Sequence, residues 1–150
     1  MRQVIDKVFA YITAHHHLLV LRHPSAPEAG IQVPAGTVEA NEPAEKAVLR
    51  EAFEETGLRD FTLHCFLGEQ ERDMTDFGRD EIHHRFFYHL EYDGKFVLTW
   101  RHEEVDHSRP PSAVPPLFEF FWVPLPDGVP LLIADHGIML PQMASCPLTW

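Results

Sequence analysis

The sequence predicts an α/β fold that is built on a mixed β-sheet. Two observations carry this prediction. Apolar, β-prone segments lie both before and after one central helical segment, and the apolar stretch Leu131–Met143 is compatible with a short final helix. Strands on both sides of a helix in the chain, with helices available to cover them, are typical of α/β architectures.

The residues before the helix predict a β-hairpin followed by a loop. Val8–Ala14 and Leu18–Arg22 are short apolar runs, and His15–His17 between them predict the turn. Consecutive residues of a tight turn point in different directions, so we do not expect these histidines to bind a metal. Residues 24–30 are a loop by composition, and residues 31–33 predict a short strand.

The central helix is predicted from its end signals. Pro43 is tolerated in a first helical turn, and Asn41 or Glu42 would cap the helix just before it. Gly57 suits the left-handed position that ends many helices.

The second half of the chain predicts three more strands. Phe61–Glu71 and Glu81–Tyr92 are long, apolar and aromatic, and Asp73–Asp80 would form the turn between them. Residues 101–116 are polar, end in prolines, and predict an irregular loop. Phe118–Leu125 is an aromatic run that predicts the last strand.

Length and composition predict a single domain over residues 1–150, with a sizeable core. No apolar run approaches the roughly 18 residues of a membrane-spanning helix. Cys65 and Cys146 show neither metal-site spacing nor a disulfide framework, so a reducing, cytoplasmic setting is expected. The net charge of −11 argues against binding to a nucleic acid polymer.

Three glutamates of the predicted helix indicate a cation site. Residues three and four apart are neighbours on a helix, so Glu51, Glu54 and Glu55 share one face. Their repulsion costs roughly 0.2–0.5 kcal/mol per pair in an isolated helix, and a bound cation reverses that sign. Mg²⁺ prefers a few carboxylates together with water and phosphate oxygens. A solvated acidic face is the alternative, because Arg50 and Lys46 offer ordinary surface pairing.

The stretch Gly36–Leu58 resembles the Nudix box, the signature of the Nudix (MutT-like) hydrolases. The family pattern fixes a glycine, a glutamate, an Arg-Glu pair, a Glu-Glu pair, and a glycine followed by an aliphatic residue. The matching positions are Gly36, Glu42, Arg50, Glu51, Glu54, Glu55, Gly57 and Leu58. Ala52 fills an aliphatic position with a small residue. The resemblance implies the Nudix fold, an α/β/α sandwich with a mixed sheet and a loop–helix catalytic box.

The resemblance also implies a ligand set and a reaction. Glu51, Glu54 and Glu55 would bind one or more Mg²⁺ or Mn²⁺ ions, joined by the backbone carbonyl of Gly36. Glu42, Arg50 and Gly57 would act structurally, and direct ligation by Glu42 is the less favoured alternative. The implied reaction is hydrolysis of a nucleoside diphosphate linked to another group, by attack of activated water on a phosphorus.

Two roles fall outside the box. Family members take the general base either from the box or from a late loop, where this chain has Glu103 and Glu104. We expect these two to outrank Glu119, which lies in a strand with less freedom to approach. Arg22 and Arg85 are candidates for binding substrate phosphate oxygens, with ordinary ion pairing as the alternative.

The sequence therefore predicts a metal-dependent pyrophosphohydrolase that acts on a small-molecule nucleotide. Neither a nucleic acid polymer nor a membrane is an expected partner, and a homodimer stays open. The alternative function is a nucleotide-binding sensor on the same scaffold, and a purely structural domain is a third. Such sensors often lose box glutamates, whereas this chain keeps all of them, which favours the enzyme.

Overall fold

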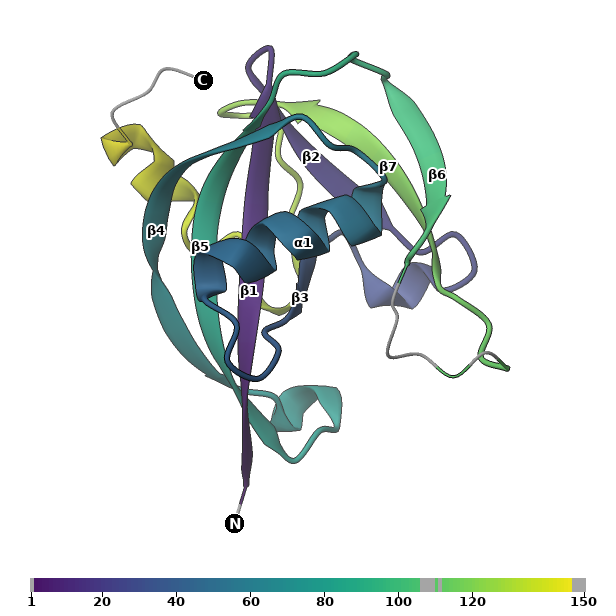
Figure 1. Cartoon of the computed structure of the whole chain (residues 1–150), viewed down its shortest axis with the longest axis vertical. Coiled ribbons are helices and arrows are strands. Elements are labelled where there is room, and N and C mark those ends of the chain that lie inside the picture. Colours follow the sequence, from purple (N-terminus) through teal and green to yellow (C-terminus); the bar gives the residue numbers. More distant parts are fainter. Residues whose placement is uncertain (1, 106–109, 111, 147–150) are drawn as a thin grey trace.

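The computed structural model describes residues 2–105, 110 and 112–146. Within these residues, seven strands form one sheet in the order β4–β5–β1–β2–β7–β6, and β3 pairs with β1 beside this path (Figure 1). β1 and β5 run parallel while the other paired strands are antiparallel, so the sheet is mixed as predicted. In the described part of the chain, no helix is long and apolar enough to cross a membrane.

The elements follow one another along the chain as β1 (Gln3–Ala14), β2 (His17–Arg22), η1 (Pro27–Ala29), β3 (Ala35–Thr37), α1 (Ala44–Thr56), β4 (Phe61–Asp73), η2 (Thr75–Phe77), β5 (Glu81–Tyr92), β6 (Thr99–Glu103), β7 (Leu117–Pro124), η3 (Ile133–Asp135) and η4 (Leu140–Ser145), where η denotes a 3-10 helix.

The sheet is covered on both faces, because the side chains of β1 alternate between two cores. Val8, Ala10 and Ile12 pack with Ala47, Val48 and Ala52 of α1 on one face. Phe9 and Tyr11 point to the other face, where they pack with Leu132 and Met143 from the C-terminal segment. Figure 1 shows α1 lying across the sheet, with η4 at the side of β4. This is the predicted α/β/α arrangement, with 3-10 turns as its second helical layer.

On the side away from β5, β1 pairs with two different strands, β3 and β2. This arrangement places β3 near the site. The middle residues of β1, Lys7–Phe9, pair with β3, so that Gly36 lies opposite Val8. Its end turns at His15 and His16 into β2. The short strand β3 is thereby held under α1, with its backbone close to the helix.

Several predicted elements shift in the structure. The strand predicted at residues 31–33 is only a single β-bridge between Gln32 and Leu21. The residues that pair with β1 as a strand come after Pro34 and form β3. The N-cap of α1 is Pro43, without a side-chain hydrogen bond. Neither predicted cap residue caps the helix: Asn41 has a positive φ, and the carboxylate of Glu42 is taken by Arg50.

Two further corrections concern the second half of the chain. Part of the predicted loop 101–116 belongs to the edge strand β6, which pairs with β7. Its side chains are polar, but strand pairing is made by the backbone and does not require apolar side chains. Residues 106–109 and 111 of that loop lie outside the described residues. The predicted final helix consists of η3 and η4, separated by a turn that contains Gly137.

The sequence predicted no disulfide framework for the two cysteines, and the structure contradicts this prediction. Cys65 of β4 and Cys146, directly after η4, form a disulfide although 81 residues separate them in sequence. Spacing along the chain carries no information about this contact, which arises because the C-terminal segment folds back over the face of the sheet.

Replacing Gly57 by alanine is expected to lower the free energy of unfolding by about 1–2 kcal/mol, because Gly57 ends α1 with φ +77°. An added Cβ would also lie 2.7 Å from Cδ2 of His102. Gly78→Ala is the matched control, since Gly78 has φ +76° but no neighbour within 4 Å of the new atom. Urea unfolding should show a larger loss of unfolding free energy for Gly57→Ala than for Gly78→Ala. Equal losses would mean that the side chain of His102 can move aside at no cost.

Candidate active site

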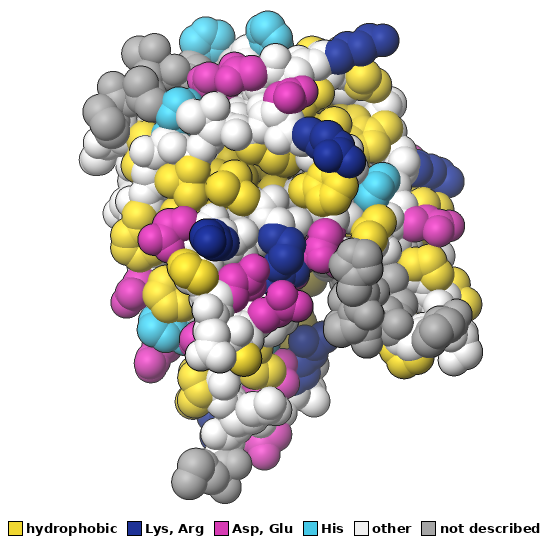
Figure 2. Space-filling model, viewed as in Figure 1, with side chains coloured by type: hydrophobic (Ala, Val, Ile, Leu, Met, Phe, Trp, Pro, Cys, Tyr) yellow, Lys and Arg dark blue, Asp and Glu magenta, His cyan; other side chains and the backbone are white. Residues whose placement is uncertain are grey.

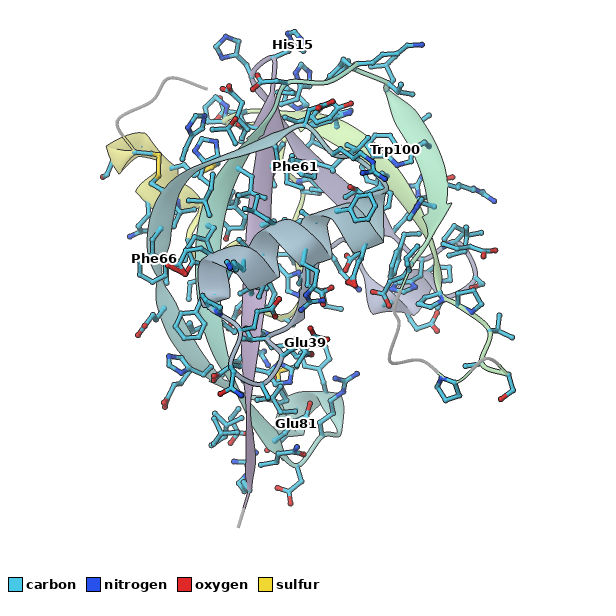
Figure 3. All side chains as sticks on the ribbon, viewed as in Figure 1. His15, Glu39, Phe61, Phe66, Glu81 and Trp100 are labelled. Atoms are coloured by element: carbon cyan, nitrogen blue, oxygen red, sulfur yellow. A yellow bond between two sulfur atoms is a disulfide. The ribbon has the colours of Figure 1, made fainter. Side chains whose placement is uncertain are left out.

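The C-terminal half of α1 and the segment after β6 are held together by backbone and side-chain hydrogen bonds. The N–H of Val105 donates to the carbonyl of Glu54 at 3.1 Å, and the N–H of Glu104 donates to the carbonyl of Pro116 at 3.1 Å. Trp100 of β6 donates its ring N–H to the carbonyl of Thr56 at 3.0 Å, and Figure 3 shows it beside that end of the helix. These bonds fix Glu104 against the acidic face of α1.

Three carboxylates meet at this point. Glu51, Glu55 and Glu104 each place one oxygen within 4.8 Å of the others. Burial raises the pKa of Glu51 to about 7, although Arg50 opposes the shift. Burial, with Glu104 and Glu51 close by, raises the pKa of Glu55 well above its usual range. Carboxylates gathered in a partly buried place repel one another, and a divalent cation supplies the compensating charge.

The glycine of β3 permits the close approach of the helix. A Cβ on Gly36 would lie 1.9 Å from Cδ of Glu51, so a larger residue would displace that carboxyl group. The backbone of the neighbouring Ala35 favours the charged form of Glu55 and so opposes part of the rise in its pKa. The backbone of β3 and the carboxylates of α1 therefore lie close together. Ligation of a metal by the carbonyl of Gly36 stays a prediction.

Arg50 organises the other carboxylates of the box. Its guanidinium donates to both oxygens of Glu42, at 2.8 and 2.9 Å, and lowers the pKa of that carboxyl. It also donates to Glu51 at 2.8 Å and to Glu54 at 2.9 Å. A further bond to the carbonyl of Thr37 at 3.0 Å ties the loop to the helix. Glu54, predicted as a ligand, is thus turned toward Arg50 and is not part of the cluster of three.

The three late glutamates that were candidates for the base have different surroundings. Glu104 lies with Glu51 and Glu55, whereas Glu103 is exposed at the end of β6. Glu119 accepts hydrogen bonds from Arg22 at 2.7 Å and from Arg101 at 3.1 Å. Of these glutamates, the structure brings Glu104 to the box.

A cationic cavity of about 370 Å³ adjoins the carboxylates. Its charged lining residues are Lys7, Arg79, Arg85 and the acidic Glu28, and its aromatic lining residues are Phe9 and Phe77. Burial lowers the pKa of His83, and that of His136 to about 3, so these two imidazoles in the lining do not add to the positive charge. Burial lowers the pKa of Arg85 to about 10, which leaves the guanidinium protonated at neutral pH. Arg85 donates to the carbonyl of Ala134, while its Nε is buried without a hydrogen-bond partner. Arg22, the other predicted cation, instead pairs with Glu119 and stacks over Phe121.

Lys7 joins the cavity to the carboxylates, and the sequence reasoning missed it. It lines the cationic cavity and also a second cavity of about 630 Å³ that contains Glu51, Glu54 and Glu104. Its amino group donates to the hydroxyl of Thr37 at 2.8 Å. The signal available in the sequence was a lysine directly before the apolar run of β1. Figure 2 shows acidic and basic side chains interspersed at the centre of this face.

Comparison with protein families gives one match, which covers most of the chain. The NUDIX domain model matches residues 4–142. No curated protein sequence matches the chain.

Three solved structures illustrate the similarity of fold. The MutT NUDIX hydrolase from Burkholderia pseudomallei is 24% identical with a TM-score of 0.58, over 93% of this chain and 98% of that one. The E. coli ORF135 protein is 21% identical with a TM-score of 0.62, over 95% and 91%. A bifunctional NMN adenylyltransferase/ADP ribose pyrophosphatase from Francisella tularensis, complexed with AMP and Mn ion, is 16% identical with a TM-score of 0.55, over 97% and 43%.

Proposed function

Because this chain belongs to the Nudix family of pyrophosphohydrolases, we propose that it hydrolyses a nucleoside diphosphate linked to another group, with a divalent cation as cofactor. The observation that carries the proposal is the cluster of Glu51, Glu55 and Glu104 beside a cationic cavity. Negative charge on one side suits cations, and positive charge on the other suits phosphate oxygens.

The residues present fit Mg²⁺ or Mn²⁺ in their chemistry. Carboxylate oxygens and a backbone carbonyl are hard ligands, and few of them are available, which leaves positions for water and substrate oxygens. We assign Glu51, Glu55 and the carbonyl of Gly36 as ligands, with Glu54 as a further ligand after release from Arg50. When bound, the cation polarises phosphoryl oxygens and lowers the pKa of water.

The chain's own residues would bind and orient the substrate. Lys7 lies between the two cavities, so it is placed to hold a non-bridging oxygen of the phosphate next to the carboxylates. Arg85 is buried in the wall of the cavity and would add positive charge that attracts the phosphate oxygens. Phe77 offers an exposed ring for an apolar or aromatic part of the substrate, whereas Phe9 is buried between Phe87 and the guanidinium of Arg85. Glu104, with Glu103 as the alternative, would accept the proton of the attacking water.

The remaining expectations belong to the same proposal. The domain would span residues 1–150, since the family match leaves few residues on either side. A small-molecule nucleotide is the expected partner. A homodimer stays a prediction from the sequence. A cytoplasmic setting also stays a prediction, but the Cys65–Cys146 disulfide removes the cysteine argument for it.

A substrate panel tests the proposed function. Nucleoside triphosphates, ADP-ribose, nucleotide sugars, NADH and dinucleoside polyphosphates should be assayed with Mg²⁺ and Mn²⁺. Product analysis in ¹⁸O-labelled water would locate the attacked phosphorus. Turnover of at least one compound is expected, and tight nucleotide binding without turnover would favour a sensor instead.

Metal binding should stabilise the protein, because the carboxylate cluster exists in the folded chain and not in the unfolded one. At a metal concentration about 100 times Kd, the expected gain is about 2.7 kcal/mol, or roughly 5–10 °C in Tm. Melting in Mg²⁺ or Mn²⁺ should be compared with melting in EDTA. An unchanged Tm together with activity in EDTA would contradict the metal dependence.

Lys7→Met should raise KM about tenfold, the equivalent of about 1.4 kcal/mol, because it keeps the side-chain length but removes the charge between the cavities. Arg22→Met is the matched comparison, since Arg22 pairs with Glu119 on the neighbouring strand. We expect its KM to stay near the wild-type value. A larger effect of Arg22→Met than of Lys7→Met would return Arg22 to the phosphate-binding role.

A further inference from the structure

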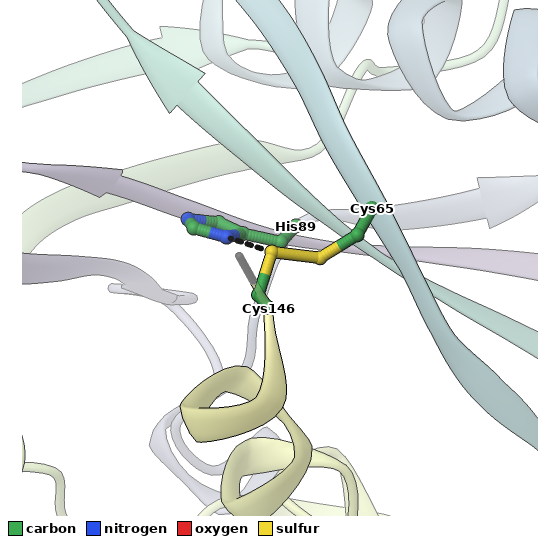
Figure 4. A group of neighbouring side chains, drawn as sticks. All are labelled: Cys65, His89 and Cys146. Atoms are coloured by element: carbon green, nitrogen blue, oxygen red, sulfur yellow. Dashed lines mark hydrogen bonds between the residues drawn. A yellow bond between two sulfur atoms is a disulfide. The ribbon is translucent and has the colours of Figure 1, made fainter. Parts of the chain in front are cut away.

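A second group of metal-ligating side chains lies on the opposite face of the sheet from α1. Cys65 of β4, His89 of β5 and Cys146 after η4 each place one ligand atom within 4.8 Å of the others (Figure 4). Nδ1 of His89 is 3.5 Å from Sγ of Cys146. Two sulfurs and one imidazole nitrogen from three separate elements form a softer donor set than the oxygens of the box.

His89 is held in the orientation that a metal ligand needs. Its side chain is fully buried, and its Nε2 lies 2.7 Å from the hydroxyl of Thr13 on β1. If Nε2 carries the proton and donates to Thr13, Nδ1 presents its lone pair to the sulfurs. Metal-binding histidines commonly have this arrangement, with the second nitrogen fixed by a hydrogen bond.

A further imidazole, that of His64, lies beside His89 but outside the group of three. The pairing of β4 with β5 is irregular between Leu63 and Cys65, so His64 falls where the register shifts. Its ring packs against His89 at a centroid distance of 5.3 Å. Nε2 of His64 is buried without a hydrogen bond, 3.5 Å from a carboxylate oxygen of Glu91. An orphaned buried nitrogen is costly unless a further partner exists.

We propose that the reduced protein binds one Zn²⁺ through Cys65, Cys146 and His89, with His64 completing a four-ligand set. Zinc favours four-coordinate sites with sulfur and nitrogen ligands, and Cys₂His₂ is a common structural set. The site is separate from the carboxylate cluster, and it would tie the C-terminal segment to β4 as the disulfide does. The inference does not depend on the proposed hydrolase function.

Zinc and the disulfide exclude each other, because both need the same two sulfurs. A dithiol reductant supplies two electrons and two protons, so that the S–S bond breaks into two thiols while the reductant becomes a disulfide. Zinc binding to the two thiols then releases two protons as the thiolates form. An oxidant that restores the disulfide would expel the metal.

Metal titration of the full chain tests the proposal. The protein is reduced, freed of metal without air, and titrated with Zn²⁺ against a chromophoric chelator. Millimolar Mg²⁺ is present throughout, because it competes with Zn²⁺ for carboxylate oxygens but not for thiolates. Co²⁺ provides a second readout, because thiolate ligation gives charge-transfer absorption. One equivalent of tightly bound Zn²⁺ is expected, with its release when the disulfide is reformed.

Single substitutions identify the ligands. Cys146→Ser and His64→Gln should each weaken Zn²⁺ binding at least tenfold, and Cys146→Ser should remove part of the charge-transfer band. His84→Gln is the matched control on β5, since His84 is half-buried and faces Asp6 and Glu69. Absence of stoichiometric zinc in the reduced wild type, or unchanged affinity in Cys146→Ser, would overturn the site. Unchanged affinity in His64→Gln would overturn the four-ligand set.

Discussion

Glu55→Gln is expected to lower kcat by about 10²–10³-fold while leaving the fold intact. Glutamine keeps the size and helix propensity of glutamate but removes the charge that a hard cation needs. Glu55 is 5% exposed and lies with two other carboxylates. Removing its charge therefore relieves burial and repulsion, and the metal-free protein should be at least as stable as the wild type.

Steady-state kinetics, melting in EDTA and metal titration together check this expectation. Glu45→Gln is the matched control, because Glu45 is exposed in the first turn of the same helix. Wild-type turnover in Glu55→Gln would favour the alternative, in which the acidic face of α1 is a solvated surface without a bound metal. A loss of activity accompanied by a lower Tm in EDTA would point to misfolding instead.

Glu104→Gln is the second substitution with a large expected effect, a fall in kcat of about 10²-fold or more. Its carboxylate is placed with those of Glu51 and Glu55, where it can accept a proton from a water held at the cluster. If Glu104 acts as the base, metal affinity should stay near the wild-type value while kcat falls. A matching loss of metal affinity would assign it as a ligand.

Glu103→Gln tests whether the position of the Glu104 carboxylate matters, or only the negative charge of the loop. Glu103 is the adjacent residue and carries the same charge, but its side chain is exposed on β6. We expect near wild-type kcat in Glu103→Gln, measured at saturating substrate and metal. Equal losses in both variants would mean that the loop acts through its overall charge, and full activity in both would move the base back to Glu51 or Glu54.

The sequence predicted much of the fold because its local signals agree with the tertiary structure. The limits of β5 were predicted as observed, and Gly57 ends α1 in the left-handed conformation. The spacing of box residues along a helix also placed Glu51 and Glu55 together. Such features depend on neighbours in sequence, where helix and turn geometry leave few choices.

The parts that could not be predicted depend on contacts between distant segments. Glu104 joins Glu51 and Glu55 because the N–H of Val105 donates to the carbonyl of Glu54 and holds the segment after β6 against α1. Glu54 itself pairs with Arg50 and lies outside this group of three. The role of Lys7 could not be predicted, because its amino group reaches the site only through the pairing of β1 with β3. The contact of Cys65 with Cys146 likewise requires the complete sheet and its C-terminal cover.

The parallel pair of β1 and β5 has a consequence for the order in which the protein folds. Gln3 pairs with Glu81 and Thr13 with Glu91. β1, at the centre of the sheet, therefore cannot complete its pairing until residues from the second half of the chain are present. Closing so long a loop costs entropy before any pairing compensates for it, and contacts of this kind slow folding. Lys7 and Arg85 face each other across that pair. The hairpin of β1 and β2 can form early, but the cationic cavity can be assembled only after β5 has docked.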